Sequence, residues 1–184
     1  FARQIVKEAE RLGARVDEVL KAANRPELGM PEEVDIDAMV AEIGERWKPL
    51  FEQHGASLHL ELAPVGKVRT QRSLLRDALY NLLDNALKYR REDKPGKVIF
   101  RVSADRRMVT FDIEDNGLGV PAHMRKAIFE RFRRVEGPGR GLSGGHGLGL
   151  YFVAEAARLL GGKVECREGT DGGARFLLRI PRRG

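Results

Sequence analysis

Apolar positions recur at helical spacing in four stretches of the chain. The first stretch carries a single narrow stripe of apolar side chains three or four positions apart: Ile5, Ala9, Leu12, Val16, Val19 and Ala23. Such a stripe is typical of a helix that packs against one partner helix. The sequence Asn24-Arg25-Pro26 ends the pattern, because proline cannot continue a helix. We therefore predict a helix over residues 1–24, a linker over 25–33 and a main domain over 34–184.

Helical and extended patterns alternate within the main domain. Asp37 is the predicted N-cap of an amphipathic helix that runs to about His54, and further helices are predicted over residues 71–90 and 147–160. Alternation with a period of two predicts strands over residues 57–62, 97–104, 108–114, 163–167 and 174–180, and a short extended piece over 67–70. Most of these strands are placed to form hairpins. We therefore predict an α+β fold, a two-layer sandwich with three main helices.

Composition limits the class of protein. The chain has 184 residues, of which 42% are hydrophobic and 33% charged, as in soluble globular domains. No apolar run approaches the roughly 20 residues that a membrane-spanning helix needs. The lone Cys166 excludes an internal disulfide framework and a cysteine-based metal site, which suits a reducing cytosol. The chain begins at Phe1, inside a helical pattern, so we expect it to be part of a longer protein.

Residues 81–89 place polar side chains on one face of the second predicted helix of the main domain. Asn81, Asn85 and Lys88 are four and three positions apart and lie one above another. The buried face of the same helix is formed by Leu75, Leu79, Leu82 and Ala86. Amide oxygens can ligate Mg²⁺ and an ammonium can meet phosphate oxygens, so the polar face suits a metal-bound polyphosphate. Taken alone, the same pattern is more typical of a solvated helix face.

Two glycine-rich motifs lie further along the chain. Residues 115–119, Asp-Asn-Gly-Leu-Gly, follow a predicted strand directly, which predicts a tight turn that exposes the carboxylate of Asp115 where backbone can approach a ligand. Residues 144–150 open the last predicted helix, where backbone N–H groups can converge on an anion. The stretch before it, residues 135–143, is rich in glycine and predicts a mobile lid. Each motif by itself is also typical of an ordinary turn.

In order and spacing, these motifs resemble the boxes of the histidine-kinase branch of the ATPase superfamily that also holds gyrase, Hsp90-type chaperones and mismatch-repair ATPases. The N box is residues 81–89, the first glycine box 115–119, the F box 128–134, the second glycine box 145–150, and a degenerate third lies around 172–176. The resemblance runs from about Val34 to Pro181. It implies a Bergerat-type ATP-binding fold with a mixed sheet. It also implies that residues 1–24 are the C-terminal part of the second helix of a dimerisation and phosphoacceptor hairpin.

The resemblance implies a role for each residue that matches a box. Asp115 would accept a hydrogen bond from the adenine amino group of ATP, and Gly119 would let the base lie against the backbone. Asn85, assisted by Asn81, would hold Mg²⁺ on the phosphates, and these two amides with Lys88 would be the catalytic residues. Further contacts with ATP are implied for Tyr89, Gly117, Val120, Gly145, His146, Gly147, Leu148, Gly149 and Ala174.

The F box and the lid supply several basic residues. The resemblance implies that residues 133–146 form the ATP lid and that Phe129 and Phe132 anchor its start. Arg131, Arg133 or Arg134 could reach the γ-phosphate, and the sequence does not choose among them. The net charge of +6 and pI near 9.7 would also suit nucleic acid. The basic residues are spread along the chain without interleaved aromatics, so nucleic-acid binding ranks well behind ATP binding.

Two positions refine the expected chemistry. In the hydrolytic relatives, a glutamate that activates water lies four residues before the metal-binding asparagine, and here that position is Asn81. An amide cannot act as that base, so the resemblance implies phosphate transfer to another nucleophile. Ala174 stands where the family often has a hydroxyl residue, which implies the loss of one water-mediated contact.

None of the histidines is a credible phosphoacceptor. His54, His59, His123 and His146 all lie inside the catalytic domain pattern. We therefore expect this chain to bind ATP and to pass the γ-phosphate to a histidine on an absent segment, for relay to a response-regulator aspartate. The expected partners are the phosphoacceptor helix of the same or a second protomer, in a homodimer, and a receiver domain. The chain is expected to be cytoplasmic, with any membrane attachment through other parts of the protein.

Two other functions stay open at this point. The chain could be a nucleotide-binding regulatory module that has lost transfer activity, or a serine kinase of the same superfamily. The intact Asn85, Lys88 and Asp115 argue against decay but not against a regulatory use. The helical stripe over residues 1–24 favours the histidine kinase over the serine kinase.

Overall fold

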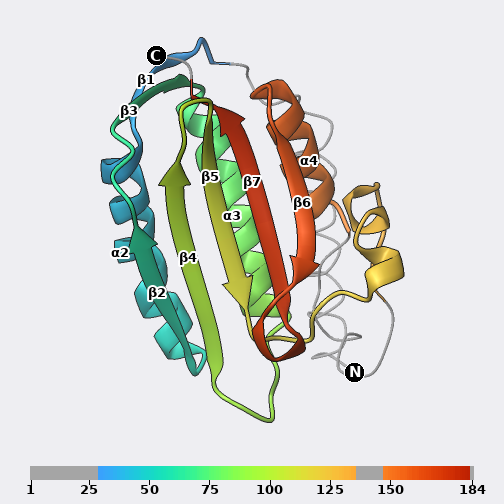
Figure 1. The fold of residues 1–184 in the computed structure, drawn as a ribbon. Helices are drawn as coiled ribbons and strands as arrows, with labels where there is room; N and C mark the ends of the chain where they lie inside the picture. Colours follow the sequence, from blue (N-terminus) through green and yellow to red (C-terminus); the bar gives the residue numbers. More distant parts are fainter. Residues whose placement is uncertain (1–28, 136–146, 183–184) are drawn as a thin grey trace, which may run out of the picture.

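Three helices cover one face of a five-stranded sheet in the computed structural model (Figure 1). The structure describes residues 29–135 and 147–182, so the helix predicted over residues 1–24 lies outside the described residues. The strands are β2 (Ala56–Leu62), β4 (Gly96–Ala104), β5 (Met108–Asp115), β6 (Lys163–Glu168) and β7 (Ala174–Pro181). The helices are α2 (Ile36–Gln53), α3 (Arg72–Lys88) and α4 (Gly149–Leu159). The predicted two-layer α+β architecture with three main helices is confirmed.

The sheet is mixed, as the resemblance implied. Its strand order is β2-β4-β5-β7-β6, with β2 and β4 parallel and every other pair antiparallel. The parallel pair arises because the chain crosses from β2 to β4 through α3, which packs behind the central strands. A second, two-stranded sheet pairs β1 (Glu32–Asp35) with β3 (Lys67–Thr70). Strand β1 begins inside the range predicted as linker, and it was missed because only Val34 of its four residues is buried.

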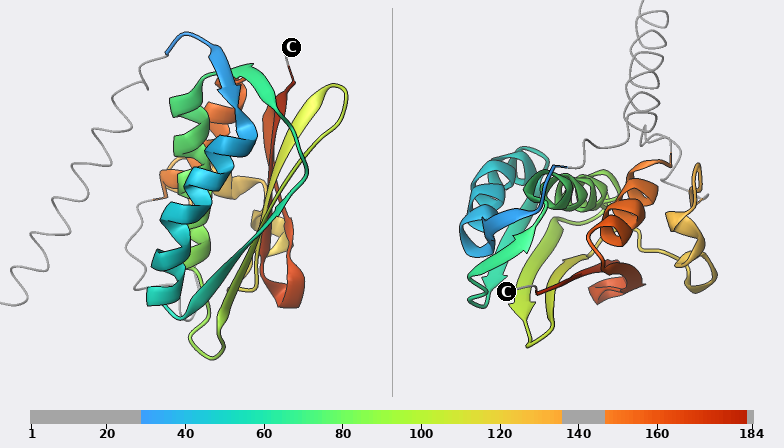
Figure 2. Two further views of the ribbon diagram at one scale, coloured as in Figure 1. Left: turned by 90° about the vertical axis from the view of Figure 1, so that its left-hand side faces the viewer. Right: turned by 90° about the horizontal axis from the view of Figure 1, so that it is seen from above.

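The core lies between the helices and the sheet, which Figure 2 shows edge-on with α2, α3 and α4 on the same side. Helix α3 is the centre of this layer. The largest fully buried side chains are Phe51, Phe100, Phe111, Ile36, Met39, Ile43, Leu75, Leu79, Leu82, Leu83, Ile113 and Leu178. Alternate residues of the strands point away from the helices, so the opposite face of the sheet carries charged side chains, among them Arg101 and Arg175. Burial on one face fixes the register of the strands.

Helix α2 begins directly after Asp35, and this residue is its N-cap. The side chain of Asp35 accepts a hydrogen bond from the backbone N–H of Ala38 at 3.0 Å. Asp37, the predicted N-cap, lies in the first turn, and its carboxylate accepts hydrogen bonds from the N–H groups of Val65 and Gly66, each at 2.9 Å. The prediction was wrong by two residues because the carboxylate of Asp37 bonds to a loop that is distant in the sequence.

Replacing Asp37 by alanine should lower the free energy of unfolding by about 2 to 4 kcal/mol, because two partly buried N–H groups lose their acceptor. The matched control is Asp35→Ala, which removes one N-cap hydrogen bond and should cost about 1 kcal/mol. Urea unfolding of both variants measures the difference. Equal losses would show that Asp37 contributes no more than an ordinary helix cap.

Candidate functional site

A pocket opens where the end of α3, the end of β5 and the start of β7 meet. Its lining residues are Asn85, Tyr89, Asp115, Gly119, Val120, Ile128, Arg133, Arg134, Val135, Leu150, Ala174 and Phe176. Six of these were predicted to contact ATP: Asn85, Tyr89, Asp115, Gly119, Val120 and Ala174. The full lining includes residues from all five boxes of the sequence, which the fold brings to one place.

Asp115 is the last residue of β5, and its carboxylate is buried in the wall of this pocket. Its Oδ1 accepts hydrogen bonds from the N–H groups of Gly117 at 2.8 Å and Ala174 at 3.2 Å. Burial raises the pKa of Asp115 to about 6, although the same two hydrogen bonds favour the ionised form. The prediction of an exposed carboxylate was wrong, because β7 and the turn pack around it and leave it only 7% exposed. Both bonds end on Oδ1, so Oδ2 can accept a donor from a ligand.

The two glycines of the first glycine box allow close packing of backbone on backbone. Gly119 has φ of +63°, and a Cβ atom built on it would lie 2.0 Å from the carbonyl oxygen of Gly172. A Cβ atom on Gly117 would lie 2.4 Å from the carbonyl oxygen of Tyr89. Both positions therefore require glycine for the turn itself, and Gly117 is not among the residues that line the pocket.

Asn85 presents an amide group whose hydrogen bonding is incomplete. Its Nδ2 is shielded from solvent and has no hydrogen-bond partner among the described residues. An unpaired buried amide is costly in a folded protein, and in a pocket wall it indicates a site for a ligand. Either end of the amide can face the pocket, because the two orientations differ only by a flip of the group.

The other polar residues of the N box have partners on their own helix. Asn81 donates a hydrogen bond from Nδ2 to the carbonyl oxygen of Asp77 at 2.8 Å, and Lys88 pairs with Asp84 at 2.6 Å. Neither residue is among those that line the pocket. The Oδ1 atom of Asn81 lies beside Gly149, where a Cβ atom would approach it to 3.0 Å. The polar face of the helix therefore meets the start of α4.

Of the second glycine box, Gly145 and His146 lie outside the described residues. Helix α4 begins at Gly149, two residues later than predicted, because Gly147 has φ of +72° and cannot be part of a helix. The carbonyl oxygen of Gly147 accepts a hydrogen bond from the N–H of Phe132 at 3.1 Å. Gly147, Leu148 and Gly149 are not among the residues that line the pocket, whereas Leu150 is.

The two F-box phenylalanines behave differently. Phe129 packs edge-on against Phe176 of β7, with ring centroids 6.4 Å apart. Phe132 is 68% exposed and has φ of +61°. The prediction that both rings anchor the start of the lid is therefore wrong for Phe132, whose ring leaves the core where the backbone turns toward Gly147.

The structure separates the three arginines that the sequence left equivalent. Arg133 and Arg134 line the pocket. Arg131 instead donates a hydrogen bond from Nη2 to the hydroxyl oxygen of Tyr151 at 2.8 Å, and its guanidinium carbon lies 4.6 Å from the centre of that ring. Arg133 and Arg134 are therefore better placed to meet an anionic group in the pocket.

Sequence reasoning missed the apolar wall of the pocket. This wall consists of Ile128, Val135, Leu150 and Phe176. Ile128, Leu150 and Phe176 belong to boxes that had been recognised, and their apolar character was the only signal available. An apolar wall in the same pocket as Asp115 suits a planar aromatic base with one hydrogen-bonding edge.

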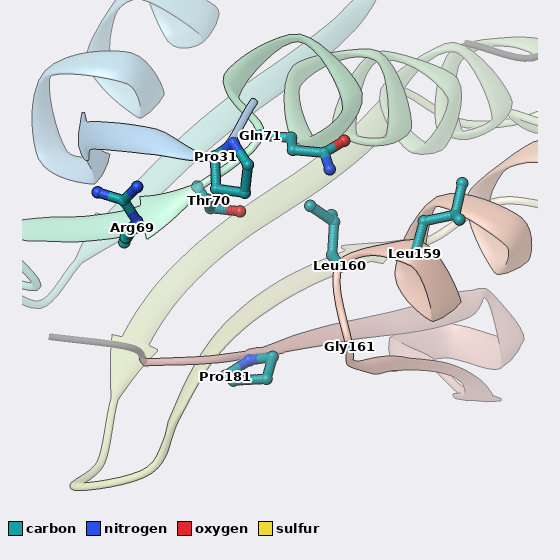
Figure 3. Close-up of a pocket in the computed structure, with 8 residues that line it drawn as sticks. All are labelled: Pro31, Arg69, Thr70, Gln71, Leu159, Leu160, Gly161 and Pro181. Atoms are coloured by element: carbon teal, nitrogen blue, oxygen red, sulfur yellow. The ribbon is translucent and has the colours of Figure 1, made fainter. Parts of the chain in front are cut away.

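A second hollow lies at the other end of β7, beside Pro181 (Figure 3). Its lining residues are Pro31, Arg69, Thr70, Gln71, Leu159, Leu160, Gly161 and Pro181. Figure 3 shows that the guanidinium of Arg69 turns away from Leu159 and Leu160. No carboxylate lines this hollow, so it offers no counterpart of Asp115. The pocket at Asp115 is the stronger candidate site.

Together, the sandwich, the buried carboxylate at the end of a central strand and the unpaired amide on the facing helix define a nucleotide-binding domain of the ATPase class. Residues 70–184 match the family model described as "Histidine kinase-, DNA gyrase B-, and HSP90-like ATPase". The chain belongs to this family, and the predicted fold class and superfamily are confirmed.

Two bacterial sensor proteins are among the curated relatives. The sensor protein CreC of Escherichia coli is 33% identical over 185 residues, an alignment that covers 99% of this chain and 38% of CreC. The alginate biosynthesis sensor protein KinB of Pseudomonas aeruginosa is 33% identical over 148 residues, 80% of this chain and 24% of KinB. The chain thus spans less than half the length of either relative. It has the ATP-binding catalytic domain that is found in sensor histidine kinases.

Solved structures agree with this assignment. The mycobacterial sensor histidine kinase MprB superposes with a TM-score of 0.69 at 27% identity, covering 84% of this chain and 99% of that one. Full-length ShkA in complex with AMPPNP superposes with a TM-score of 0.79 at 26% identity, covering 95% of this chain and 36% of ShkA.

No helix in the described ranges is long and apolar enough to span a membrane.

Proposed function

We propose that this chain is the catalytic part of a two-component sensor histidine kinase that transfers the γ-phosphate of ATP to a histidine outside the chain. The observation that carries the proposal is the placement of Asp115 and Asn85 in the same pocket. The buried carboxylate of Asp115 can accept a hydrogen bond from the adenine amino group, and the apolar wall can hold the base. Asn85, Arg133 and Arg134 line the same pocket and would then meet the phosphates.

Mg²⁺ would be held at Asn85 through the amide oxygen, after the flip that exchanges this oxygen with the unpaired Nδ2. Asn81, with its Oδ1 beside the start of α4, would assist it. No group of three His, Cys, Asp or Glu side chains suited to a metal ion occurs within residues 29–135 and 147–182. We therefore propose that the metal is held by one or two amides together with phosphate oxygens and water. When bound, it would neutralise charge on the phosphates.

The position of Asn81 favours phosphate transfer over hydrolysis. Its side-chain nitrogen is committed to the carbonyl oxygen of Asp77, and an amide does not take up the proton of an attacking water. The glutamate that would act as general base in hydrolytic relatives is thus replaced by an amide, which forms hydrogen bonds but cannot accept the proton. ATP would stay intact until an external nucleophile reaches the γ-phosphate.

The nucleophile is proposed to be a histidine on a phosphoacceptor helix of the same or a second protomer in a homodimer. His54 caps the end of α2, with its Nδ1 2.8 Å from the carbonyl oxygen of Leu50, and His59 lies exposed on β2 beside Ser57. Neither lines the pocket. We further propose that the phosphate passes to an aspartate of a response-regulator receiver domain. This part of the protein would work in the cytoplasm, with any membrane anchor elsewhere.

Mixing the chain with the dimerisation hairpin of the full-length protein tests this function. With γ-labelled ATP and Mg²⁺, we expect acid-labile phosphate on the histidine of the hairpin and none on the isolated chain. Stable label on the isolated chain would contradict the absence of an acceptor. ATP binding without transfer would instead support the regulatory-module alternative, and label on a serine of a partner would support a serine kinase.

Replacing Asn85 by alanine should weaken the binding of ATP in the presence of Mg²⁺ by about tenfold, which corresponds to the loss of one ligand to a bound cation. Calorimetric titration with ATP, with and without EDTA, measures this change. The matched control is Asp77→Ala on the same helix, because Asp77 pairs with Arg76 at the surface and does not line the pocket. If both variants bind ATP equally well, Asn85 does not hold the metal.

A further inference from the structure

The segment between β6 and β7, residues 169–173, packs directly against the backbone around Asp115. A Cβ atom built on Gly173 would lie 1.9 Å from the carbonyl oxygen of Asp115, and one built on Gly119 would lie 2.0 Å from that of Gly172. The segment therefore lies in close backbone contact with Asp115 and Gly119. It also leads into Ala174, whose N–H donates to the carboxylate of Asp115 at 3.2 Å.

A second carboxylate holds this segment. Oε1 of Glu114 accepts a hydrogen bond from the N–H of Thr170 at 2.8 Å and another from the hydroxyl of the same residue. Successive side chains of a strand point to opposite faces of a sheet, so Glu114 and Asp115 of β5 extend in opposite directions. Two consecutive carboxylates thus bond to this part of the chain, Glu114 to Thr170 within the segment and Asp115 to Ala174 directly after it.

Glu114 is itself fixed by Arg101 of β4. Its Oε2 accepts a hydrogen bond from Nη1 of Arg101 at 2.6 Å, and the Nε of Arg101 donates to Glu61 of β2 at 2.7 Å. Burial opposes the ionisation of Glu114, but the hydrogen bonds from Thr170 and Arg101 outweigh it and hold the pKa at about 2. The carboxylate therefore stays charged, and a charged acceptor makes stronger hydrogen bonds than a neutral one.

We infer that Glu114 and Thr170 are positioning residues for adenine recognition. They hold the segment of residues 169–173 in place, and that segment presents the N–H of Ala174 that orients the carboxylate of Asp115. Neither Glu114 nor Thr170 belongs to any of the five boxes. The inference rests on the proposed function, in which Asp115 binds the adenine amino group.

The test compares ATP with purine riboside triphosphate, which lacks the amino group on the base. The wild-type chain should bind ATP roughly tenfold or more tightly than this analogue, because the analogue leaves the carboxylate of Asp115 unpaired. Thr170→Val should weaken ATP binding by about tenfold and leave binding of the analogue unchanged, so the preference for ATP is lost. Thr170→Ser keeps the hydroxyl group and should restore the preference.

Glu114→Gln is a second variant, and it tests the inference even if Thr170→Val does not fold. It removes the charge but keeps an acceptor oxygen, so we expect the preference for ATP to fall several-fold. Its matched control is Glu61→Gln, because Glu61 also bonds to Arg101 but does not touch residues 169–173. The control should keep the full preference.

The outcomes separate the inference from the function on which it rests. If the wild-type chain binds both nucleotides equally, the proposed role of Asp115 fails. If the wild-type chain prefers ATP and both Thr170→Val and Glu114→Gln keep that preference, the inference is overturned and the proposed function stands. An equal loss of affinity for both nucleotides in these variants would also overturn it, since that loss would reflect general destabilisation.

Discussion

Replacement of Asp115 by asparagine should weaken ATP binding by roughly 10- to 100-fold, the value of a charge-assisted hydrogen bond in a buried site. The asparagine oxygen can still accept the N–H groups of Gly117 and Ala174, which now bond to Oδ1. Its Nδ2 then takes the place of Oδ2 and meets the adenine amino group donor to donor. The local structure should therefore survive while the base loses its acceptor.

The same substitution should stabilise the free domain above pH 6. Burial raises the pKa of Asp115 from 3.8 to about 6, so the folded state binds this proton more tightly than the unfolded state does. Between these two pH values the wild-type stability falls as pH rises, and the loss reaches about 2 to 3 kcal/mol above pH 6. Asparagine carries no charge. The variant should therefore be no more stable than the wild type below pH 3.8, and its full gain in stability should be present above pH 6.

Calorimetric titration with ATP and urea unfolding between pH 4 and 8 measure both effects. The matched control is Asp112→Asn on the same strand, because Asp112 is buried and paired with Arg175 at 2.6 Å but does not line the pocket. The control should lose stability and keep its ATP affinity. Unchanged ATP affinity of the Asp115 variant would remove the main support for this site.

Replacement of Gly119 by alanine should lower the free energy of unfolding by about 3 to 5 kcal/mol, the sum of a left-handed backbone penalty and an overlap of atoms. The new Cβ would lie 2.0 Å from the carbonyl oxygen of Gly172 and would force the segment against Asp115 to shift. ATP binding should be lost with it. Thermal and urea unfolding measure the change in stability.

Gly66 supplies the matched control for this variant. It has φ of +75°, close to the value of +63° at Gly119, but nothing lies within 4 Å of a Cβ atom built there. Gly66→Ala should therefore cost about 1 to 2 kcal/mol, the backbone penalty alone. Similar losses in the two variants would mean that the contact between Gly119 and the segment of residues 169–173 does not constrain the fold.

Patterns within single elements predicted most of the fold. The periodicity of α3 indicated its buried face correctly, including Leu75 and Leu82, and the strands lie close to where alternation placed them. The errors concern features that depend on distant parts of the chain. Strand β1 has one buried residue, and Asp37 bonds to a loop 28 residues away, so neither left a local pattern.

The same holds for the site: local motifs predicted its residues, and the contacts with distant parts of the chain were not predicted. Box by box, the sequence indicated Asn85, Asp115 and Ala174, and the fold brings all three to one pocket. It did not indicate that the Asp115 carboxylate is buried, because β7 supplies that burial from 59 residues further along the chain. Nor did it indicate that Lys88 pairs with Asp84, since a helix face that suits phosphate also suits a local ion pair.

A crystal structure of the chain with Mg²⁺ and AMPPNP tests the central claim most directly. We expect the adenine amino group within hydrogen-bonding distance of Oδ2 of Asp115, about 2.7 to 3.2 Å, and the metal at Asn85. The base should lie between the carboxylate and the apolar wall that includes Phe176. A base bound in the hollow beside Thr70 and Gln71, or at any site without contact to Asp115, would contradict the proposed adenine site.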